Sequence, residues 1–512
     1  MFLVPFLLIV LILLVAAKYT HLYFSHRKLA SQWHTEPIEF HRNTLQTLPI
    51  LFNGSENITS GRFLQYLTDR FETRNCTAFS LTVPFFRQLI LSRSPEVMKA
   101  MFSTQFGDFN LGVRRPAFFP LLGNGIFASE GSQWKHSRNL LKPQFSKEQV
   151  GQVEMLEPHV QSLVTLIKGS CGFFDIEALF YAFTLDAASD FLFGHSADVL
   201  RGAVVERKER SGSFSGELLV NRSSFDAALG FVGTYLQIRS SLFDLYWLAN
   251  SREFQKNIGR IHAYTDQYVE KALQLTPEEI EQKSRESYIF LYELVKHTRN
   301  PMEIRDELLN ILIAGRATTA SLLSSVFMEL SRRPEIWEKL RSEVLHHFGE
   351  GTSKISFSSL KRCTYLRYVV NETLRLWPPV PQNLREAEKD TTLPVGGGKD
   401  GKAPIFVRKG SIIVILVYCV HRLKNLYGED AEAFRPERWA GLSKIGWGFM
   451  PFGSGPRVCL GQQFALTEVS YVLVRLAQTF ETITSGEREY PPKMLATAVL
   501  KYKDGVKVKF GE

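Results

Sequence analysis

The sequence predicts a mainly helical protein with small β-sheets, an α+β fold, in which an N-terminal transmembrane helix precedes a large globular body. An uninterrupted apolar run opens the chain over residues 1–17. One helix of about 30 residues is predicted over 303–332, and at roughly 45 Å it is long enough to cross a whole domain. Strand character is confined to short apolar and β-branched stretches, of which 77–91 and 411–420 are the clearest.

The composition is that of a globular chain with a large core. Of the 512 residues, 45% are hydrophobic and 39 are phenylalanine, which suits a protein that encloses an apolar cavity. No linker or repeat divides the chain, so we expect an anchor over 1–24, a connector over 25–60 and one domain over 61–512. The five cysteines are few and widely spaced, which predicts no disulfide framework and a reducing compartment.

Charges around the apolar run indicate its orientation. As a helix, residues 1–17 span about 25 Å, slightly less than a bilayer core of about 30 Å. No lysine or arginine precedes the run, whereas Lys18, Arg27 and Lys28 follow it, so the positive-inside rule places the body in the cytoplasm. The alternative, a cleaved signal peptide, lacks its basic start. The net charge of +9 fits an anionic membrane surface or an acidic partner and is too diffuse to indicate nucleic acid.

The remaining secondary structure follows from periodicity and from turn residues. A helix over 94–102 is predicted because Ser94 can cap it and Pro95 occupies its first turn. Apolar spacing and Gly/Pro content predict further helices over 61–71, 225–247 and 254–273, loops over 106–127 and 201–224, strands over 380–387 and 391–398, and a hairpin around residues 504–505.

Trp134 and Arg138 lie one turn apart on the same face of a predicted helix. An indole N–H and a guanidinium placed in this way can both bind one carboxylate. Taken alone, such a pair more often belongs to an ordinary surface face of a helix.

The middle of the long helix is apolar nearly all round, which predicts that it is buried. It contains Ala314, Gly315, Ala317 and Thr318 within one short run. A glycine in mid-helix costs about 1 kcal/mol against alanine, so we expect a packing reason for Gly315. The Thr318 hydroxyl can bond back to the carbonyl four residues earlier, and this role is compatible with a functional one.

An acid and a base are also spaced one turn apart further along the chain. Glu372 and Arg375 can pair across i, i+3 on a helix that ends before two prolines. Alone, such a pair is usually a solvated ion pair of small worth. Arg385, in the next predicted strand, can bind an anion or simply lie at the surface.

One cysteine stands in a glycine-rich loop before a long apolar helix. The loop reads Phe452-Gly453-Ser454-Gly455-Pro456-Arg457-Val458-Cys459-Leu460-Gly461. Glycines let the backbone approach a large planar ligand and turn N–H groups toward the sulfur. Those donors and the helix N-terminus stabilise a thiolate over a thiol. For a lone cysteine, a buried structural role would be the simpler interpretation.

The complete Phe-x-x-Gly-x-Arg-x-Cys-x-Gly pattern resembles the heme-binding loop of cytochromes P450. The resemblance implies the cytochrome P450 fold and heme b, with Cys459 as the thiolate ligand of the iron and Gly461 beside it in the loop. It further implies that Arg457 meets a heme propionate and that Phe452 packs beside the sulfur. Trp134 and Arg138 match the Trp-x-x-x-Arg helix of the family, and Arg385 is a candidate for the second propionate.

The resemblance extends to the central helix and to the acid–base pair. Ala314, Gly315 and Thr318 match the oxygen-binding segment. In the family, small residues there leave room for the face of the heme, and the threonine hydroxyl hydrogen-bonds the bound oxygen and the protons delivered to it. The family usually has Asp or Glu at the position of Ala317, so the proton relay departs from the usual one here. Glu372, Arg375 and Arg438 match a buried structural triad that locks the approach of the cysteine loop.

The implied function is that of a membrane-bound monooxygenase of an apolar organic substrate. Its implied partners are NADPH–cytochrome P450 reductase, docking near Lys135, Lys142 and Lys444, and the lipid of the endoplasmic reticulum membrane. Segments 122–127, 383–398 and 461–468 resemble the fungal alkane and fatty-acid hydroxylases, which implies terminal hydroxylation. A role in fungal secondary metabolism is the interpretation that we favour from the sequence, with terminal hydroxylation as its alternative. An electron-independent heme-thiolate isomerase or dehydratase and a scaffold without cofactor are remote alternatives.

Overall fold

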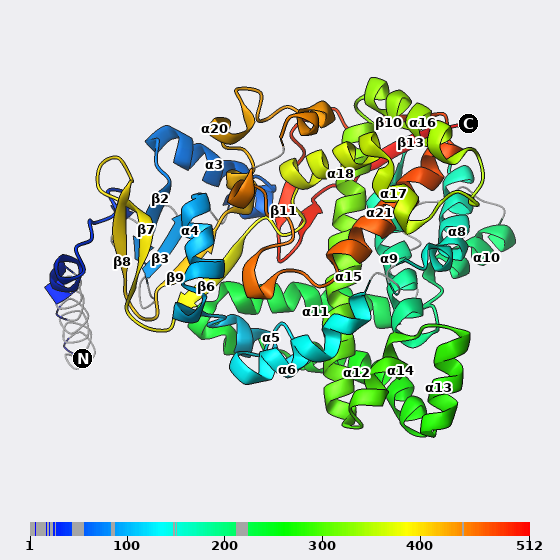
Figure 1. Ribbon diagram of the computed structural model, residues 1–512, viewed down its shortest axis with the longest axis horizontal. Helices are drawn as coiled ribbons and strands as arrows, with labels where there is room; N and C mark the ends of the chain where they lie inside the picture. The colour runs from blue at the N-terminus through cyan, green and yellow to red at the C-terminus, as the bar shows by residue number, and fades with distance from the viewer. Residues whose placement is uncertain are drawn as a thin grey trace. The chain divides into compact units, whose positions relative to one another are not determined.

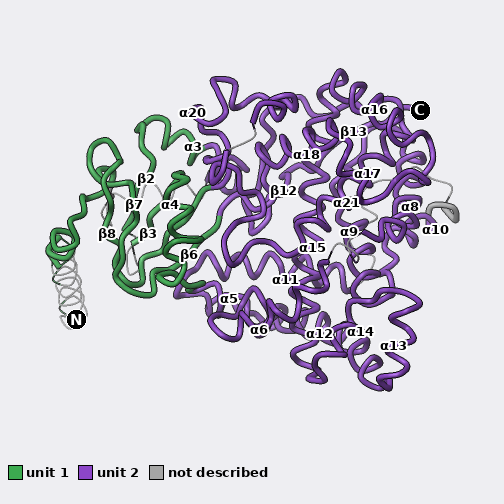
Figure 2. Tube along the Cα trace, viewed as in Figure 1, with its two compact units in different colours: residues 1–54, 66–112, 383–416 green, residues 55–65, 113–382, 417–512 purple. Residues whose placement is uncertain are grey.

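The computed structural model describes residues 6, 17, 20, 24, 25, 27–42, 56–82, 88–146, 149, 151–210, 224–442 and 445–512. The predicted anchor over 1–24 therefore lies almost entirely outside the described residues. The chain divides into two compact units, coloured separately in Figure 2. The first comprises residues 1–54, 66–112 and 383–416, and the second comprises 55–65, 113–382 and 417–512.

A six-stranded sheet organises the first unit. Its strand order is β1-β2-β3-β9-β6-β4, formed by β1 (His41–Arg42), β2 (Ala78–Thr82), β3 (Gln88–Ser92), β9 (Ile412–Ile415), β6 (Asn383–Ala387) and β4 (Phe109–Asn110). The β1–β2 and β3–β9 pairs are parallel, and the other three are antiparallel. A separate antiparallel pair joins β7 (Thr391–Gly397) to β8 (Ala403–Val407).

Helices make up most of the second unit. Their bounds are α5 (Arg114–Leu122), α6 (Gly131–Leu141), α8 (Glu157–Lys168), α9 (Ile176–Phe193), α10 (Val199–Arg210), α11 (Ser224–Ser241), α12 (Arg252–Leu273), α13 (Pro277–Glu286), α14 (Phe290–His297), α15 (Pro301–Leu330), α16 (Pro334–Phe348), α17 (Phe357–Arg362), α18 (Thr364–Leu376), α19 (Val417–Val420), α20 (Lys424–Tyr427) and α21 (Gln462–Thr479). Its small sheets are β10 (Thr482–Ser485), β13 (Lys507–Gly511) and β5 (Phe174–Asp175), and β11 (Met494–Ala496) with β12 (Leu500–Tyr502).

The predicted long helix, α15, runs through the middle of the second unit (Figure 1) and packs against α9, α12, α18 and α21. It begins at Pro301, and the Asn300 side chain caps it by accepting from the N–H groups of Met302 and Glu303. Among the described residues it is the one helix long and apolar enough to cross a membrane, and 61% of its most apolar window is buried. We therefore assign it to the protein core.

Several predicted elements are confirmed. The first predicted helix is α3 (Phe63–Arg74), and 254–273 becomes α12. The helix predicted over 225–247 is α11 only to Ser241, and a short 3-10 helix, Phe243–Leu248, follows it. Ser94 caps the short helix α4 (Pro95–Lys99) by accepting from the N–H groups of Glu96 and Val97. The helical character of the chain and its small sheets match the predicted α+β class.

The predicted loop over 106–127 is wrong in its second half, which forms α5. Arg239 of α11 donates from Nε to the Ala117 carbonyl at 2.9 Å and from Nη2 to the Pro116 carbonyl at 3.4 Å. These tertiary bonds hold a helix that contains Pro120. Propensity alone disfavours a helix with an internal proline, so the sequence pattern could not reveal it.

The predicted loop over 201–224 is also wrong where it is described, since α10 extends to Arg210. The buried Asp186 carboxylate accepts from the N–H groups of Val199 and Leu200 at 2.8 and 2.9 Å. A side chain from the preceding helix therefore accepts from the first N–H groups of α10 and fixes where this helix begins.

Two strand predictions need correction. The apolar run over 411–420 is strand only to Ile415 and continues as α19, because a short apolar run does not distinguish a strand from a buried helix. The turn at 504–505 does not close a hairpin: β12 pairs with β11, and β13 pairs with β10 and β5. The Asp175 carboxylate accepts from the Val506 N–H at 2.9 Å and so directs the chain after Gly505 toward β5.

Candidate active site

The cysteine loop closes on itself before α21. The N–H of Cys459 donates to the Phe452 carbonyl at 3.0 Å, and the N–H of Val458 donates to the Gly455 carbonyl at 3.1 Å. Gly453 and Gly455 both have a φ of 69°, a conformation that other residues rarely adopt. Gly461 precedes α21, and its carbonyl accepts from the Ala465 N–H at 2.9 Å. The loop therefore holds Cys459 just before the N-terminus of a helix.

Opposing effects act on the Cys459 thiol. Burial is the largest effect and leaves the pKa of the thiol raised, although a hydrogen bond from the Gly461 backbone and the positive charge of Arg138 each lower it. Arg138 is fixed to the same loop, because its Nη1 donates to the Val458 carbonyl at 3.1 Å. The backbone donor and the guanidinium both favour the thiolate, which is the form that ligates a metal.

Three arginines gather on one side of the loop. Arg457 donates from Nη2 to the Ser129 carbonyl at 2.9 Å and lies 4.5 Å from the centre of a Trp134 ring, while Arg138 lies 5.9 Å from the same ring. Burial, together with the charges of Arg114 and Arg138, lowers the pKa of Arg457 to about 10. Like charges held together in a buried place indicate an anionic ligand.

Arg114 was missed by the sequence analysis because it falls in the segment predicted as a loop. It lies between the rings of Phe118 and Phe127, at 5.7 and 5.6 Å from their centres. Burial lowers its pKa to about 10, and its Nε is buried without a hydrogen-bond partner. The doublet of Arg114 and Arg115 within an otherwise apolar stretch was the available signal.

A half-buried run lies in the middle of α15, between two buried stretches of the helix. Residues 313–318 are half-buried, whereas the helix is buried again from Thr319 onward. A Cβ added at Gly315 would meet no heavy atom within 4 Å. The hydroxyl of Thr318 donates to the Ala314 carbonyl at 2.6 Å, the back-bonded arrangement that the sequence allowed. The small residues of this run therefore leave one side of the helix open.

A buried acid lies next to this run. Glu468 of α21 is only 3% exposed, and burial raises its pKa to about 8, an effect that a hydrogen bond from the Thr319 side chain partly offsets. A small cavity lined by Glu468, Thr467 and Gln152 adjoins it. Glu468 therefore holds a proton at neutral pH, and it is bonded to Thr319, the residue that follows Thr318 on α15.

Glu372, Arg375 and Arg438 are brought together as one buried cluster. Arg375 donates to the two Glu372 carboxylate oxygens from Nε at 2.9 Å and from Nη2 at 2.8 Å. Arg438 donates from Nε to Glu372 Oε1 at 3.1 Å, and Trp439 donates from Nε1 to Oε2 at 3.0 Å. The side chain of Glu372 has no exposed surface. A buried carboxylate with this many donors is fully compensated.

His421 connects the triad to the cysteine loop. Its Nδ1 lies 3.2 Å from the Arg375 carbonyl, and its Nε2 accepts from the Met450 N–H at 3.0 Å. Burial lowers the pKa of His421 to about 3, so the ring is neutral and donates from Nδ1. Met450 stands two residues before Phe452, and the histidine therefore transmits the position of the triad to the loop. No sequence motif pointed to His421.

The predicted residues do not all share one unit. Trp134, Arg138, the α15 run, the triad and the cysteine loop belong to the second unit, whereas Arg385 belongs to the first. Arg385 donates from Nη1 to Asn383 Oδ1 at 2.8 Å and lies 5.1 Å from the centre of the Phe102 ring. Its predicted role toward a propionate stays a prediction.

Comparison with known proteins decides the family. Residues 43–510 match the family described as Cytochrome P450. This chain is a cytochrome P450. It is 45% identical over 466 residues to cytochrome P450 52A12 of Debaryomyces hansenii, covering 90% of this chain and 89% of the relative. It is 50% identical over 438 residues to cytochrome P450 52A10 of Candida maltosa, covering 84% and 83%. Cytochrome P450 52A6 of Candida tropicalis is 49% identical over 430 residues, covering 82% and 81%.

Members of this family are monooxygenases that carry a heme whose iron is bound by a cysteine thiolate, and Cys459 is the residue that the loop motif predicts for this ligand. The surrounding residues fit heme b, because the loop around Cys459 supplies a backbone donor to the sulfur and because the half-buried guanidinium groups of Arg114, Arg138 and Arg457 suit anionic propionates. When bound, the thiolate-ligated heme supplies the cleavage of O₂. The enzyme is an oxidoreductase that depends on NADPH and a reductase for its electrons.

The triad yields a first prediction. Glu372→Gln keeps the shape of the side chain and removes the negative charge between Arg375 and Arg438. The free energy of unfolding of the holoenzyme should fall by about 3–5 kcal/mol, measured as loss of the thiolate-type carbon monoxide spectrum in urea. The control is Glu437→Gln, an acid 47% exposed that pairs with Lys339 at 2.8 Å and should cost at most about 1 kcal/mol. Equal losses in both variants would contradict the prediction.

A second prediction concerns pH and Glu468. Its pKa is raised to about 8 in the folded protein from an ordinary value of 4.5, so the folded state binds more protons than the unfolded state between these values. The associated stability is complete below about pH 4.5 and is lost as pH rises through about 8. Glu468→Gln should remove this loss, so its stability relative to the natural enzyme should rise by on the order of 1–2 kcal/mol between pH 6 and 8. The free energy of unfolding of both proteins would be measured in urea across this pH range. If the two plots against pH ran parallel, the raised pKa of Glu468 would be ruled out.

Proposed function

We propose that this monooxygenase hydroxylates long aliphatic chains, n-alkanes or fatty acids, at their terminal carbon. The observation that carries the proposal is the similarity to cytochromes P450 of the 52A series from three yeasts, which covers more than four-fifths of this chain. It accords with the resemblance of segments 122–127 and 461–468 to fungal alkane and fatty-acid hydroxylases. The expected role in secondary metabolism receives no support from these relatives.

The balanced reaction is the insertion of one oxygen atom of O₂ into a C–H bond. The second oxygen atom leaves as water, with two protons and with two electrons from NADPH. Within this reaction we assign Ala314 and Gly315 to the open side of α15 that faces the heme, and Thr318 to the handling of oxygen and protons. Gly315 supports this assignment, since the space beside its backbone is free of protein atoms within 4 Å.

We assign the heme-holding roles to the residues around the loop. Trp134, Arg138 and Arg457 would bind one propionate, with Arg114 added to the set by its buried and uncompensated charge. Arg385 remains the candidate for the second propionate. Phe452 would pack beside the sulfur, and Gly461 would direct its backbone N–H to it, as the hydrogen bond to the thiol supports.

A membrane location completes the proposal. Residues 1–24 would anchor the enzyme as a single-pass protein of the endoplasmic reticulum membrane, with its catalytic body in the cytosol. The segment after α11 supports contact with lipid, because the short helix Phe243–Leu248 exposes 59% of Trp247 and 59% of Leu248. Aromatic and aliphatic side chains of this kind suit the membrane interface. Substrates dissolved in lipid would then reach the enzyme from that side.

NADPH–cytochrome P450 reductase is the electron donor that we propose. Lys135 and Lys142, which lie in and just after α6, are exposed and suit an acidic partner surface. Lys444, the third basic residue considered for this surface, lies outside the described residues.

Turnover in microsomes that contain the enzyme and a reductase tests the substrate class. Alkanes, fatty acids and fungal polyketide extracts would be supplied in parallel, and products with one added oxygen would be located by mass spectrometry. We expect oxygen at the chain terminus of the aliphatic substrates and none with Cys459→Ala. Oxidation confined to the extracts would refute the aliphatic assignment and return the enzyme to secondary metabolism.

Proton delivery gives a further prediction, because Ala317 stands where the family usually has an acid. We propose that water and Thr318 deliver protons with some loss of coupling. Ala317→Asp should therefore raise the amount of product formed per NADPH consumed by at least about two-fold, whereas Ala317→Asn, of similar size and without the acid, should not. A lower ratio in the Asp variant would show that the hypothesis is wrong.

A further inference from the structure

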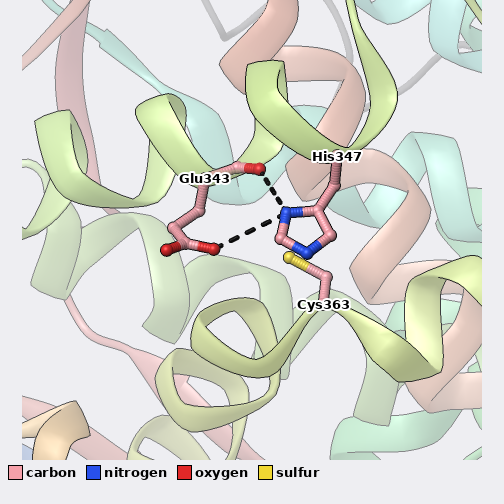
Figure 3. Close-up of side chains that lie close together, drawn as sticks. All are labelled: Glu343, His347 and Cys363. Atoms are coloured by element: carbon pink, nitrogen blue, oxygen red, sulfur yellow. Dashed lines mark hydrogen bonds and ion pairs between the residues drawn. The ribbon is translucent and has the colours of Figure 1, made fainter.

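A group of metal-ligating side chains lies away from the cysteine loop. Glu343 and His347 stand one turn apart on α16, and Cys363 lies at the junction of α17 and α18. Donor atoms of all three residues lie within 4.8 Å of one another. Figure 3 shows the imidazole ring between the Glu343 carboxylate and the Cys363 sulfur, with one ring nitrogen toward each. Neither the monooxygenase reaction nor the heme uses these residues.

The local structure fixes the group. His347 Nδ1 lies 2.9 Å from the Glu343 carbonyl and 3.6 Å from its carboxylate. Cys363 is buried, and its N–H donates to the Ser359 carbonyl at 3.2 Å while it caps the start of α18. Burial and the charge of Glu343 raise the pKa of the Cys363 thiol, whereas a backbone hydrogen bond from Leu366 and the charge of Arg367 lower it. The backbone at Cys363 is thus held in place, whereas the exposed His347 side chain can rotate once it gives up its contact with the Glu343 carbonyl.

We propose that Glu343, His347 and Cys363 form a zinc site. Zinc accepts this mixture of sulfur, nitrogen and carboxylate oxygen, at about 2.3 Å for sulfur and about 2.0–2.2 Å for the others. Around one tetrahedral ion, donors at these distances lie roughly 3.3–3.8 Å apart, so small rotations of the half-exposed Glu343 and the exposed His347 complete the geometry. Water takes the fourth position. Mg²⁺ and Ca²⁺ are disfavoured because they prefer oxygen ligands alone.

Binding of zinc has a structural consequence. It replaces the thiol proton of Cys363, which passes to solvent, and links α16 to the α17–α18 junction. Helices α16, α17 and α18 all pack against α21, the helix that begins at the cysteine loop. Zinc should therefore stabilise the holoenzyme by binding its folded form.

Zinc bound per heme measures this site directly. The purified holoenzyme would be equilibrated with zinc against a chromogenic chelator, and bound zinc would be counted by mass spectrometry with heme iron as the internal standard. We expect one zinc per heme and at least a ten-fold weaker affinity in His347→Gln and Cys363→Ser. The matched controls are His346→Gln, the exposed neighbour on α16, and Cys171→Ser, an exposed cysteine elsewhere in the chain; both should bind like the natural enzyme.

The ligand set gives an independent readout. X-ray absorption at the zinc edge should show one sulfur at about 2.3 Å and nitrogen or oxygen neighbours at about 2.0–2.2 Å. His347→Gln alters an exposed side chain, and the carbon monoxide spectrum of each variant verifies that it has folded and holds heme. Unchanged affinity in both ligand variants, a zinc shell without sulfur, or no bound zinc in the natural holoenzyme would each overturn the proposal.

Discussion

The ion pairs of the buried Glu372 carboxylate with Arg375 and Arg438 are the interactions on which the position of the cysteine loop depends. The carboxylate accepts from Arg375, Arg438 and Trp439, and the remaining guanidinium hydrogens bond to carbonyls, such as those of His421 and Tyr427. A charge without exposed surface is tolerable only when it is so completely paired. Leaving any one of these buried charges unpaired would cost free energy of folding. Only one arrangement of α18 and of the segment around Arg438 avoids that cost. Through His421 and the Met450 N–H, this arrangement also fixes where the cysteine loop begins.

The other side of the loop shows the reverse situation. Arg114, Arg138 and Arg457 are close enough for their charges to act on one another, and burial lowers the pKa of each. Their bonds to carbonyls, such as that of Arg457 to Ser129, satisfy individual donors and leave the charge uncompensated. A fold that compensates Glu372 so fully has no structural need for such a cluster. The excess positive charge is therefore best explained by the two negatively charged propionates of a heme.

Elements defined by a local signal could be predicted from the sequence, and elements defined by distant residues could not. The apolar pattern of one segment predicts the long helix over 303–332, within two residues of each end of α15, Pro301–Leu330. In contrast, α10 starts where Asp186 accepts its first N–H groups, and α5 is supported by Arg239. The same division holds in the site: the cysteine loop and triad residues stand in recognisable motifs, whereas Arg114, His421 and Glu468 gain their importance only from what surrounds them.

The two neighbouring threonines of α15 have different surroundings, and this difference bears on how protons move. Thr318 lies on the half-buried run and donates to Ala314, so it must rotate away from that carbonyl before it can donate elsewhere. Thr319 is buried and bonds to Glu468, whose raised pKa keeps a proton there at neutral pH. Glu468 and the loop glycine Gly461 belong to the same stretch of chain, at and just before α21. A displacement of α21 would therefore move the start of the helix beside Cys459 and the buried proton of Glu468 together, which couples the position of the cysteine loop to the surroundings of Thr319.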